Sequence, residues 1–148
     1  MADPSIQPRY LIHPALIGAG SGLLIAVFVT DEFYRRSMLF QWNNFSMWLI
    51  LFGLVVALLA AIGLVVDAMR GALGAISWIR FGGFTVAVLL SILNAFVHTR
   101  DAYTAVVPTG WTISLIVAAI LVVLGATGGW SLLAAPRPHT AQTGESSR

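Results

Sequence analysis

Hydrophobic side chains run almost without interruption through four stretches of the chain, and charged residues gather between them. A helix needs roughly 20 apolar residues to cross a hydrocarbon core about 30 Å thick. We therefore expect four transmembrane helices, over Ile12–Thr30, Phe45–Val66, Phe81–Val97 and Trp111–Ala135. This pattern predicts an all-α integral membrane protein whose four helices form an up-down bundle within residues 1–135.

The last residues of the chain have a different character. Residues 136–148, PRPHTAQTGESSR, are polar, interrupted by proline and without apolar periodicity. A segment that cannot bury apolar surface does not gain enough free energy to order its backbone. We expect this segment to be a disordered tail on the cytoplasmic side.

Composition agrees with a protein whose solvent is lipid. The chain is 58% hydrophobic and 9% charged, which leaves too few charged residues to cover a water-soluble domain. It has no cysteine, so disulfides, thiolate metal sites and cysteine nucleophiles are excluded. The net charge of +2 comes from scattered arginines, and phosphate binding by a nucleic-acid interface needs basic residues clustered on one face.

The arginines also predict an orientation. An even number of spans puts both termini on one side of the membrane, and that side carries Arg9, Arg70, Arg80, Arg137 and Arg148. The other side carries Arg35, Arg36 and Arg100. Because cytoplasmic loops are enriched in basic residues, we expect a multi-pass protein of the bacterial inner membrane with both termini in the cytoplasm.

Small residues recur within three of the spans at spacings that allow helix backbones to approach closely. The helix-packing positions predicted on this basis are Gly18, Gly22, Gly53, Ala57, Gly125 and Gly129. Contacts inside one bundle account for the pattern, and contacts between copies of the chain would use the same pattern. The oligomeric state therefore stays open.

Polar residues gather at the end of the third span. Ser91, Asn94, His98 and Asp101 follow a helical spacing that puts them on one face. The first interhelical loop ends on the same side and supplies possible partners. The outer-face polar cluster predicted in this way consists of Asp31, Glu32, Arg35, Asn43, Asn44, Asn94, His98, Arg100 and Asp101. The cluster either joins the loops and caps the helix ends, or forms a polar pocket or docking surface for a partner.

Four-helix membrane bundles can hold haem b between histidines. His13 opens the first span and His98 closes the third, so the two residues lie at opposite faces of a membrane core about 30 Å thick. This separation excludes a haem with both histidines from one chain, although His13 or His98 alone, or histidines from two chains, remain alternative ligands. We predict no bound cofactor and no metal site. The sequence has neither a phosphate-binding glycine loop nor an HExxH motif, so we predict that the protein is not an enzyme.

Four segments resemble a known family. They are TDEFY at Thr30–Tyr34, WNNFSMWL at Trp42–Leu49, GLVVD at Gly63–Asp67 and NAFVHTRDAYTAVVPTG at Asn94–Gly110. In order and spacing, over about residues 13–133, they are similar to the bacterial membrane family called domain of unknown function 2231. The resemblance implies a four-span bundle, and it implies an association with proteins of periplasmic redox metabolism as an anchor or electron-transfer partner.

The chain departs from that family pattern on the terminal side. Arg80 stands where many members carry a histidine, whereas the outer-face segments are intact. We therefore expect a structural or accessory membrane subunit that presents its outer-face cluster to a membrane or periplasmic protein, with the lipid bilayer as its other partner. The alternative is an electron-transfer subunit that binds haem b or quinone beside a periplasmic dehydrogenase.

Overall fold

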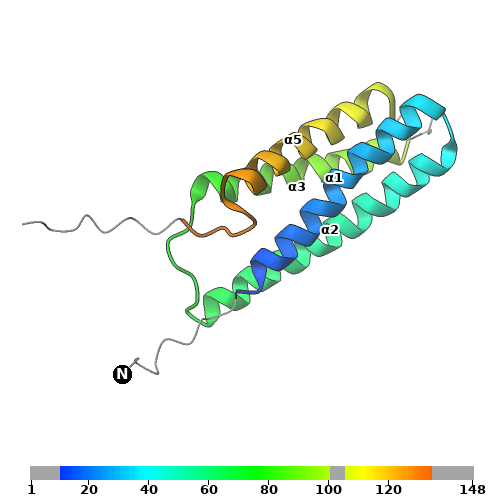
Figure 1. Ribbon diagram of the computed structural model, residues 1–148. Helices are drawn as coiled ribbons and strands as arrows, with labels where there is room; N and C mark the ends of the chain where they lie inside the picture. Colours follow the sequence, from blue (N-terminus) through cyan, green and yellow to red (C-terminus); the bar gives the residue numbers. More distant parts are fainter. Residues whose placement is uncertain (1–10, 101–105, 135–148) are drawn as a thin grey trace, which may run out of the picture.

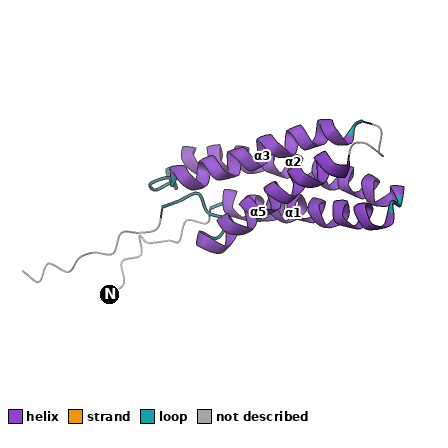
Figure 2. Ribbon diagram, turned by 90° about the horizontal axis from the view of Figure 1, so that it is seen from above, coloured by secondary structure: helices purple, strands orange, loops and turns teal. Residues whose placement is uncertain are grey.

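The computed structural model describes residues 11–100 and 106–134 of the chain, and four helices in these ranges are long and apolar enough to span a membrane. They are α1 (His13–Ser37), α2 (Phe40–Met69), α3 (Trp78–His98) and α5 (Trp111–Gly128), and a short irregular helical turn, η1 (Val106–Gly110), precedes α5. The four helices lie along one common direction in both views (Figures 1 and 2). The predicted four-helix membrane bundle is confirmed.

The first two helices form a long antiparallel hairpin. The predicted loop between the first two spans is wrong in its extent, because α1 continues to Ser37 and α2 begins at Phe40. Met38 adopts a left-handed conformation (φ 54°) and donates its backbone N–H to the Tyr34 carbonyl oxygen, which ends α1. Asp31, Glu32 and Tyr34 therefore lie on a helix.

The hairpin turn defines the two ends of the bundle. We call the end with the Ser37–Phe40 turn and η1 the distal end. The opposite end, with the start of α1, the α2–α3 loop and the residues after α5, is the terminal end (Figure 1). The distal end corresponds to the outer face of the sequence-based orientation.

Close approach of α1 and α2 depends on glycine. A Cβ atom on Gly53 would lie 2.6 Å from Cδ2 of Leu24, and one on Gly20 would lie 3.6 Å from the backbone nitrogen of Ala57. Gly53 and Ala57 thus lie at the predicted helix contact. Their partner on α1 is Gly20, which the prediction did not include.

The other four predicted packing positions have different surroundings. Gly22 has no neighbour within 4 Å of a Cβ position, so it does not lie at a contact between helices within the described part of this chain. The assignment of Gly129 to a helix contact is wrong. Gly129 has φ 65° and ends α5, and a Cβ atom on it would have no neighbour within 4 Å. Gly18 and Gly125 provide space for a side chain and not for a helix backbone, since a Cβ on either would lie within 2.8 Å of the Trp130 indole.

The fourth helix is shorter than the predicted span. α5 ends at Gly128, and the predicted end at Ala135 lies outside the described residues. After the helix, the chain turns back against the α2–α3 loop, where Ser77 donates its N–H to the Leu132 carbonyl oxygen at 2.9 Å. The Arg80 guanidinium donates a hydrogen bond to the Gly129 carbonyl oxygen, which compensates the C-terminal end of the α5 dipole.

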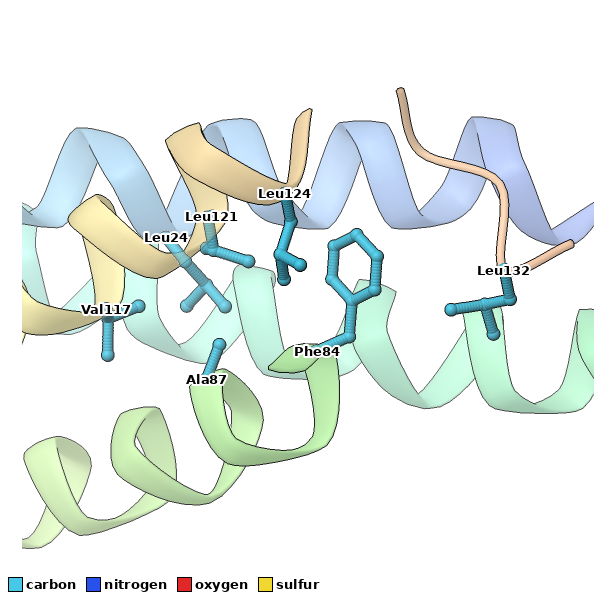
Figure 3. Close-up of a cluster of buried hydrophobic side chains, with 7 residues drawn as sticks. All are labelled: Leu24, Phe84, Ala87, Val117, Leu121, Leu124 and Leu132. Atoms are coloured by element: carbon cyan, nitrogen blue, oxygen red, sulfur yellow. The ribbon is translucent and has the colours of Figure 1, made fainter. Parts of the chain in front are cut away.

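The hydrophobic core joins α1, α3 and α5. Its buried members are Leu24, Phe84, Ala87, Val117, Leu121, Leu124 and Leu132. Figure 3 shows that Leu132 comes from the segment after α5 and continues this cluster beyond Phe84, toward the terminal end. Polar side chains occupy the interior on both sides of this apolar centre.

Candidate functional site

A buried histidine–aspartate pair lies at the terminal end. Asp67 is in the last turn of α2, and its Oδ2 atom lies 2.8 Å from Nδ1 of His13, the first residue of α1. The same carboxylate accepts the backbone N–H groups of Ile12, at 2.9 Å, and of His13, at 3.0 Å. Both side chains of the pair are 0% exposed. Asp67 therefore caps the N-terminus of α1 from the neighbouring helix.

The hydrogen-bond partners fix the protons of this terminal pair. The backbone N–H of Leu132 lies 3.4 Å from Nε2 of His13, and an N–H group can only donate, so Nε2 is the acceptor. Nδ1 then carries the hydrogen and donates it to Asp67. A neutral imidazole thus faces an ionised carboxylate, whose charge the N-terminal end of the α1 dipole stabilises.

A second buried pair lies at the distal end. Nε2 of His98, the last residue of α3, is 3.1 Å from Oδ1 of Asp31 on α1. Ser46 of α2 donates its hydroxyl to the same oxygen at 2.5 Å, and Thr30 Oγ1 lies 2.7 Å from Ser46 Oγ. Asp31 was one of several possible partners of His98 in the sequence-based cluster, and the structure brings these two residues together with contributions from three helices.

The distal pair holds an additional proton. Nδ1 of His98 lies 3.0 Å from the Asn94 carbonyl oxygen, which can only accept, so Nδ1 carries a hydrogen. A hydrogen bond between Nε2 and the Asp31 oxygen, which are 3.1 Å apart, then requires one more proton between these two atoms. No backbone N–H among the described residues donates to Asp31, whereas the Asp67 carboxylate accepts two.

Two asparagines of the predicted cluster also lie in the interior of the distal half. Asn43 and Asn94 are each 2% exposed, and the amide oxygens of both have no hydrogen-bond partner within the described part of the chain. The Oδ2 atom of Asp31 is likewise unpartnered there. The distal interior therefore contains acceptor oxygens in excess of donors.

Glu32 and Arg35 of the cluster form a separate network on the surface, together with Arg36 and Trp111, which the prediction did not include. Glu32 accepts hydrogen bonds from Arg35 at 2.8 Å and from Arg36 at 2.5 Å. The indole N–H of Trp111, at the start of α5, donates to Glu32 at 2.8 Å, and the Arg35 guanidinium lies 5.5 Å from the centre of a Trp111 ring. We call these four residues the distal surface network.

The remaining predicted members do not join either group. Asn44 and Arg100 are exposed at the distal end, and no hydrogen bond or ion pair within the described residues uses either side chain. Asp101 lies outside the described residues. The predicted single cluster is therefore a buried layer around Asp31 and His98 plus the distal surface network.

The histidines do not suit a haem ligand role in this arrangement. Both ring nitrogens of His13 and both of His98 have partners, so an axial bond to iron would break one of these contacts. The two residues also lie at opposite ends of the bundle, as predicted. Within residues 11–100 and 106–134, no group of three histidine, aspartate or glutamate side chains converges on a metal position.

Sequence reasoning missed the partner of His13. Asp67 directly follows the predicted span Phe45–Val66 and was not connected with His13, although Ile12 offers no side chain to cap α1. An antiparallel hairpin brings the end of its second helix to the start of its first. The absence of a capping residue before Pro14, together with a lone acid at the end of the next span, was the available signal.

Comparisons with known proteins agree with this architecture. A family model described as "Predicted membrane protein (DUF2231)" matches residues 9–135. The match confirms the resemblance indicated by the four sequence segments. No curated protein and no solved structure matches the chain.

Proposed function

The chain belongs to the DUF2231 family of predicted membrane proteins, and we propose that it is a structural or accessory subunit whose distal surface network binds a protein partner. The observation that carries the proposal is the order imposed by Glu32, which fixes two arginines of α1 and an indole of α5 in one arrangement. Side chains that are already ordered lose less conformational entropy on binding. The exposed guanidinium of Arg36 favours an acidic surface on the partner.

The buried pairs support a scaffold role. Each pair joins two helices through residues that are far apart in the sequence, and each is closed to solvent. Neither pair presents a free imidazole nitrogen with which to act as an acid, a base or a ligand. We therefore propose that the protein has no catalytic activity of its own.

We further propose that the protein lies in the bacterial inner membrane with its distal end in the periplasm. The support is the excess of arginine on the terminal side, as the positive-inside rule requires. Because the chain has no cysteine, a single Ser37→Cys substitution provides a unique label. A membrane-impermeant maleimide should modify it in intact spheroplasts, and modification only after permeabilisation would reverse the proposed orientation.

Site-specific photo-crosslinking in the native host tests partner binding. A photoreactive phenylalanine at Arg36 should give one discrete adduct with a second protein. The matched control is the same substitution at Leu58, which is 63% exposed in the middle of α2. Absence of an adduct at position 36, or the same adduct from both positions, would contradict the proposed surface.

The absorption spectrum of the purified protein tests the electron-transfer alternative. We expect no Soret band in the oxidised protein and no haem signal after reduction with dithionite. A reduced-minus-oxidised signal that disappears in His13→Ala or His98→Ala would contradict the scaffold proposal.

A further inference from the structure

An apolar slot lies between the distal halves of α2 and α3. Its volume is about 340 Å³, and its walls include Met47, Trp48 and Leu51 of α2 and Ala95 of α3. Trp48 and Leu51 are about half exposed, so the slot opens on the outside of the bundle. In a membrane protein this side faces hydrocarbon. We call this feature the α2–α3 slot.

The slot is too large to remain empty in a bilayer. Atoms that line a void lose their dispersion contacts on one side. Along α1 and α2, glycine removes such a gap, because Gly53 admits the Leu24 side chain. The α2–α3 slot is instead lined by large side chains, and its volume falls in the range of specific ligand sites.

The distal rim of the slot is polar and positively charged. Asn44 and Thr99 line it, and Arg100 follows Thr99 in the chain. Within the described residues, no side-chain hydrogen bond or ion pair uses the Asn44 amide or the Arg100 guanidinium. Arg35 and Arg36, in contrast, are both paired with Glu32. A guanidinium that has no partner among the described residues therefore lies beside the slot.

His98 also lines the slot, but it has no free hydrogen-bonding atom for a ligand. Its two ring nitrogens are bonded to Asp31 and to the Asn94 carbonyl. A neutral quinone held by its carbonyl oxygen would need a donor at that depth. The unused donors at Asn44 and Arg100 lie at the interface, which is the depth of a phospholipid phosphate.

We propose that the α2–α3 slot binds one anionic phospholipid, with an acyl chain between the two helices and the phosphate against Asn44 and Arg100. The chain supplies the dispersion contacts that the slot lacks, and the phosphate compensates the unpaired guanidinium. This site is separate from the distal surface network and does not depend on the proposed protein partner.

Native mass spectrometry of the full chain tests the site. Detergent-purified protein is mixed with equal amounts of phosphatidylglycerol and phosphatidylcholine that carry the same acyl chains. We expect one phosphatidylglycerol to remain bound under conditions that remove phosphatidylcholine. Equal retention of both lipids, retention of neither by folded protein, or a retained quinone in place of phospholipid would overturn the proposal.

Two substitutions separate the chain contact from the headgroup contact. Ala95→Phe fills the slot and should abolish lipid retention, whereas Ala119→Phe on the exposed face of α5 should leave it unchanged. Arg100→Gln should reduce the preference for phosphatidylglycerol about fivefold, the effect of one interfacial arginine. Arg36→Gln, which removes another exposed distal arginine, should not reduce it.

A second slot-filling variant guards against misfolding. If circular dichroism shows that Ala95→Phe does not fold, Leu51→Trp provides the same test from α2, where the parent side chain is already half exposed. Lipid retention by a folded slot-filling variant at the level of the parent protein would show that the acyl chain binds elsewhere.

Discussion

At the terminal end of the bundle, the Asp67 carboxylate accepts two backbone N–H groups and the Nδ1–H of His13, whereas at the distal end Asp31 is bonded only to side chains, those of Ser46 and His98. The two pairs contain the same residue types and are equally buried. They differ in whether backbone N–H groups donate hydrogen bonds to the aspartate. Four-helix bundles can thus use one kind of pair in two electrostatic settings, an ionised helix cap and a pair that shares an additional proton.

The difference follows from where each aspartate lies on its helix. Asp67 faces the start of α1, where backbone N–H groups have no partners within the helix. Asp31 lies within α1 and faces the end of α3, where carbonyl groups are in excess. A carboxylate is stabilised at the first position. At the second it needs a proton or a hydroxyl donor.

Asp67→Asn should have the largest effect. The amide would place an N–H₂ group among three donors that need an acceptor, and breaking a buried pair costs about 3–5 kcal/mol. The free energy of unfolding in mixed micelles would measure the loss. If the loss is no larger than that of Asp31→Asn, the assignment of an ionised helix cap at the terminal end is wrong.

Asp31→Asn should be tolerated better. An amide resembles a carboxyl group that shares a proton, and it keeps an oxygen for the Ser46 hydroxyl. We expect a loss of about 1–2 kcal/mol in the free energy of unfolding, the cost of a rearranged buried hydrogen bond. A loss equal to that of Asp67→Asn would remove the distinction between the two pairs.

Ser46→Ala tests which residues act together. Removal of the hydroxyl that donates to Asp31 should cost about 1 kcal/mol. Combined with Asp31→Asn, the effect should be non-additive by about 0.5 kcal/mol or more, because the two residues share one hydrogen bond. Combined with Asp67→Asn at the other end, it should be additive. Coupling across the bundle would show that the two ends are not independent.

Glycine substitutions between the two pairs should have the smallest effects. Gly53→Ala places a Cβ against Leu24 and should cost about 1 kcal/mol through overpacking. Gly22→Ala meets open space, so the better helix propensity of alanine should leave stability unchanged or slightly raised. The free energy of unfolding in mixed micelles measures both effects. If Gly22→Ala lowers the free energy of unfolding more than Gly53→Ala does, Gly22 of α1 lies at a contact with another chain.

Much of the architecture could be predicted from the sequence. The four spans can be predicted from the length of the apolar stretches. In lipid, the backbone N–H and C=O groups of a stretch must be hydrogen-bonded within the protein, and a helix achieves this within its own segment. Asp31 and His98 could be recognised as possible partners, since both lie at the ends of their spans that face the same side of the membrane. The end of α1 and the start of α2 could not be predicted from apolar length. Polar residues such as Glu32 and Arg35 were assigned to a loop, but they lie on a helix that extends beyond the apolar stretch.

The sequence by itself determined the number of helices, their up-down order and the ends at which polar residues gather. Only the tertiary structure decided which polar atoms meet. Asp67 caps α1, Leu132 bonds His13, and Trp111 joins Glu32 across a long separation in the chain. The physical reason is that hydrophobicity is a sum along one segment, whereas a hydrogen bond depends on the rotation and register of two helices, which close packing at residues such as Gly20 and Gly53 sets.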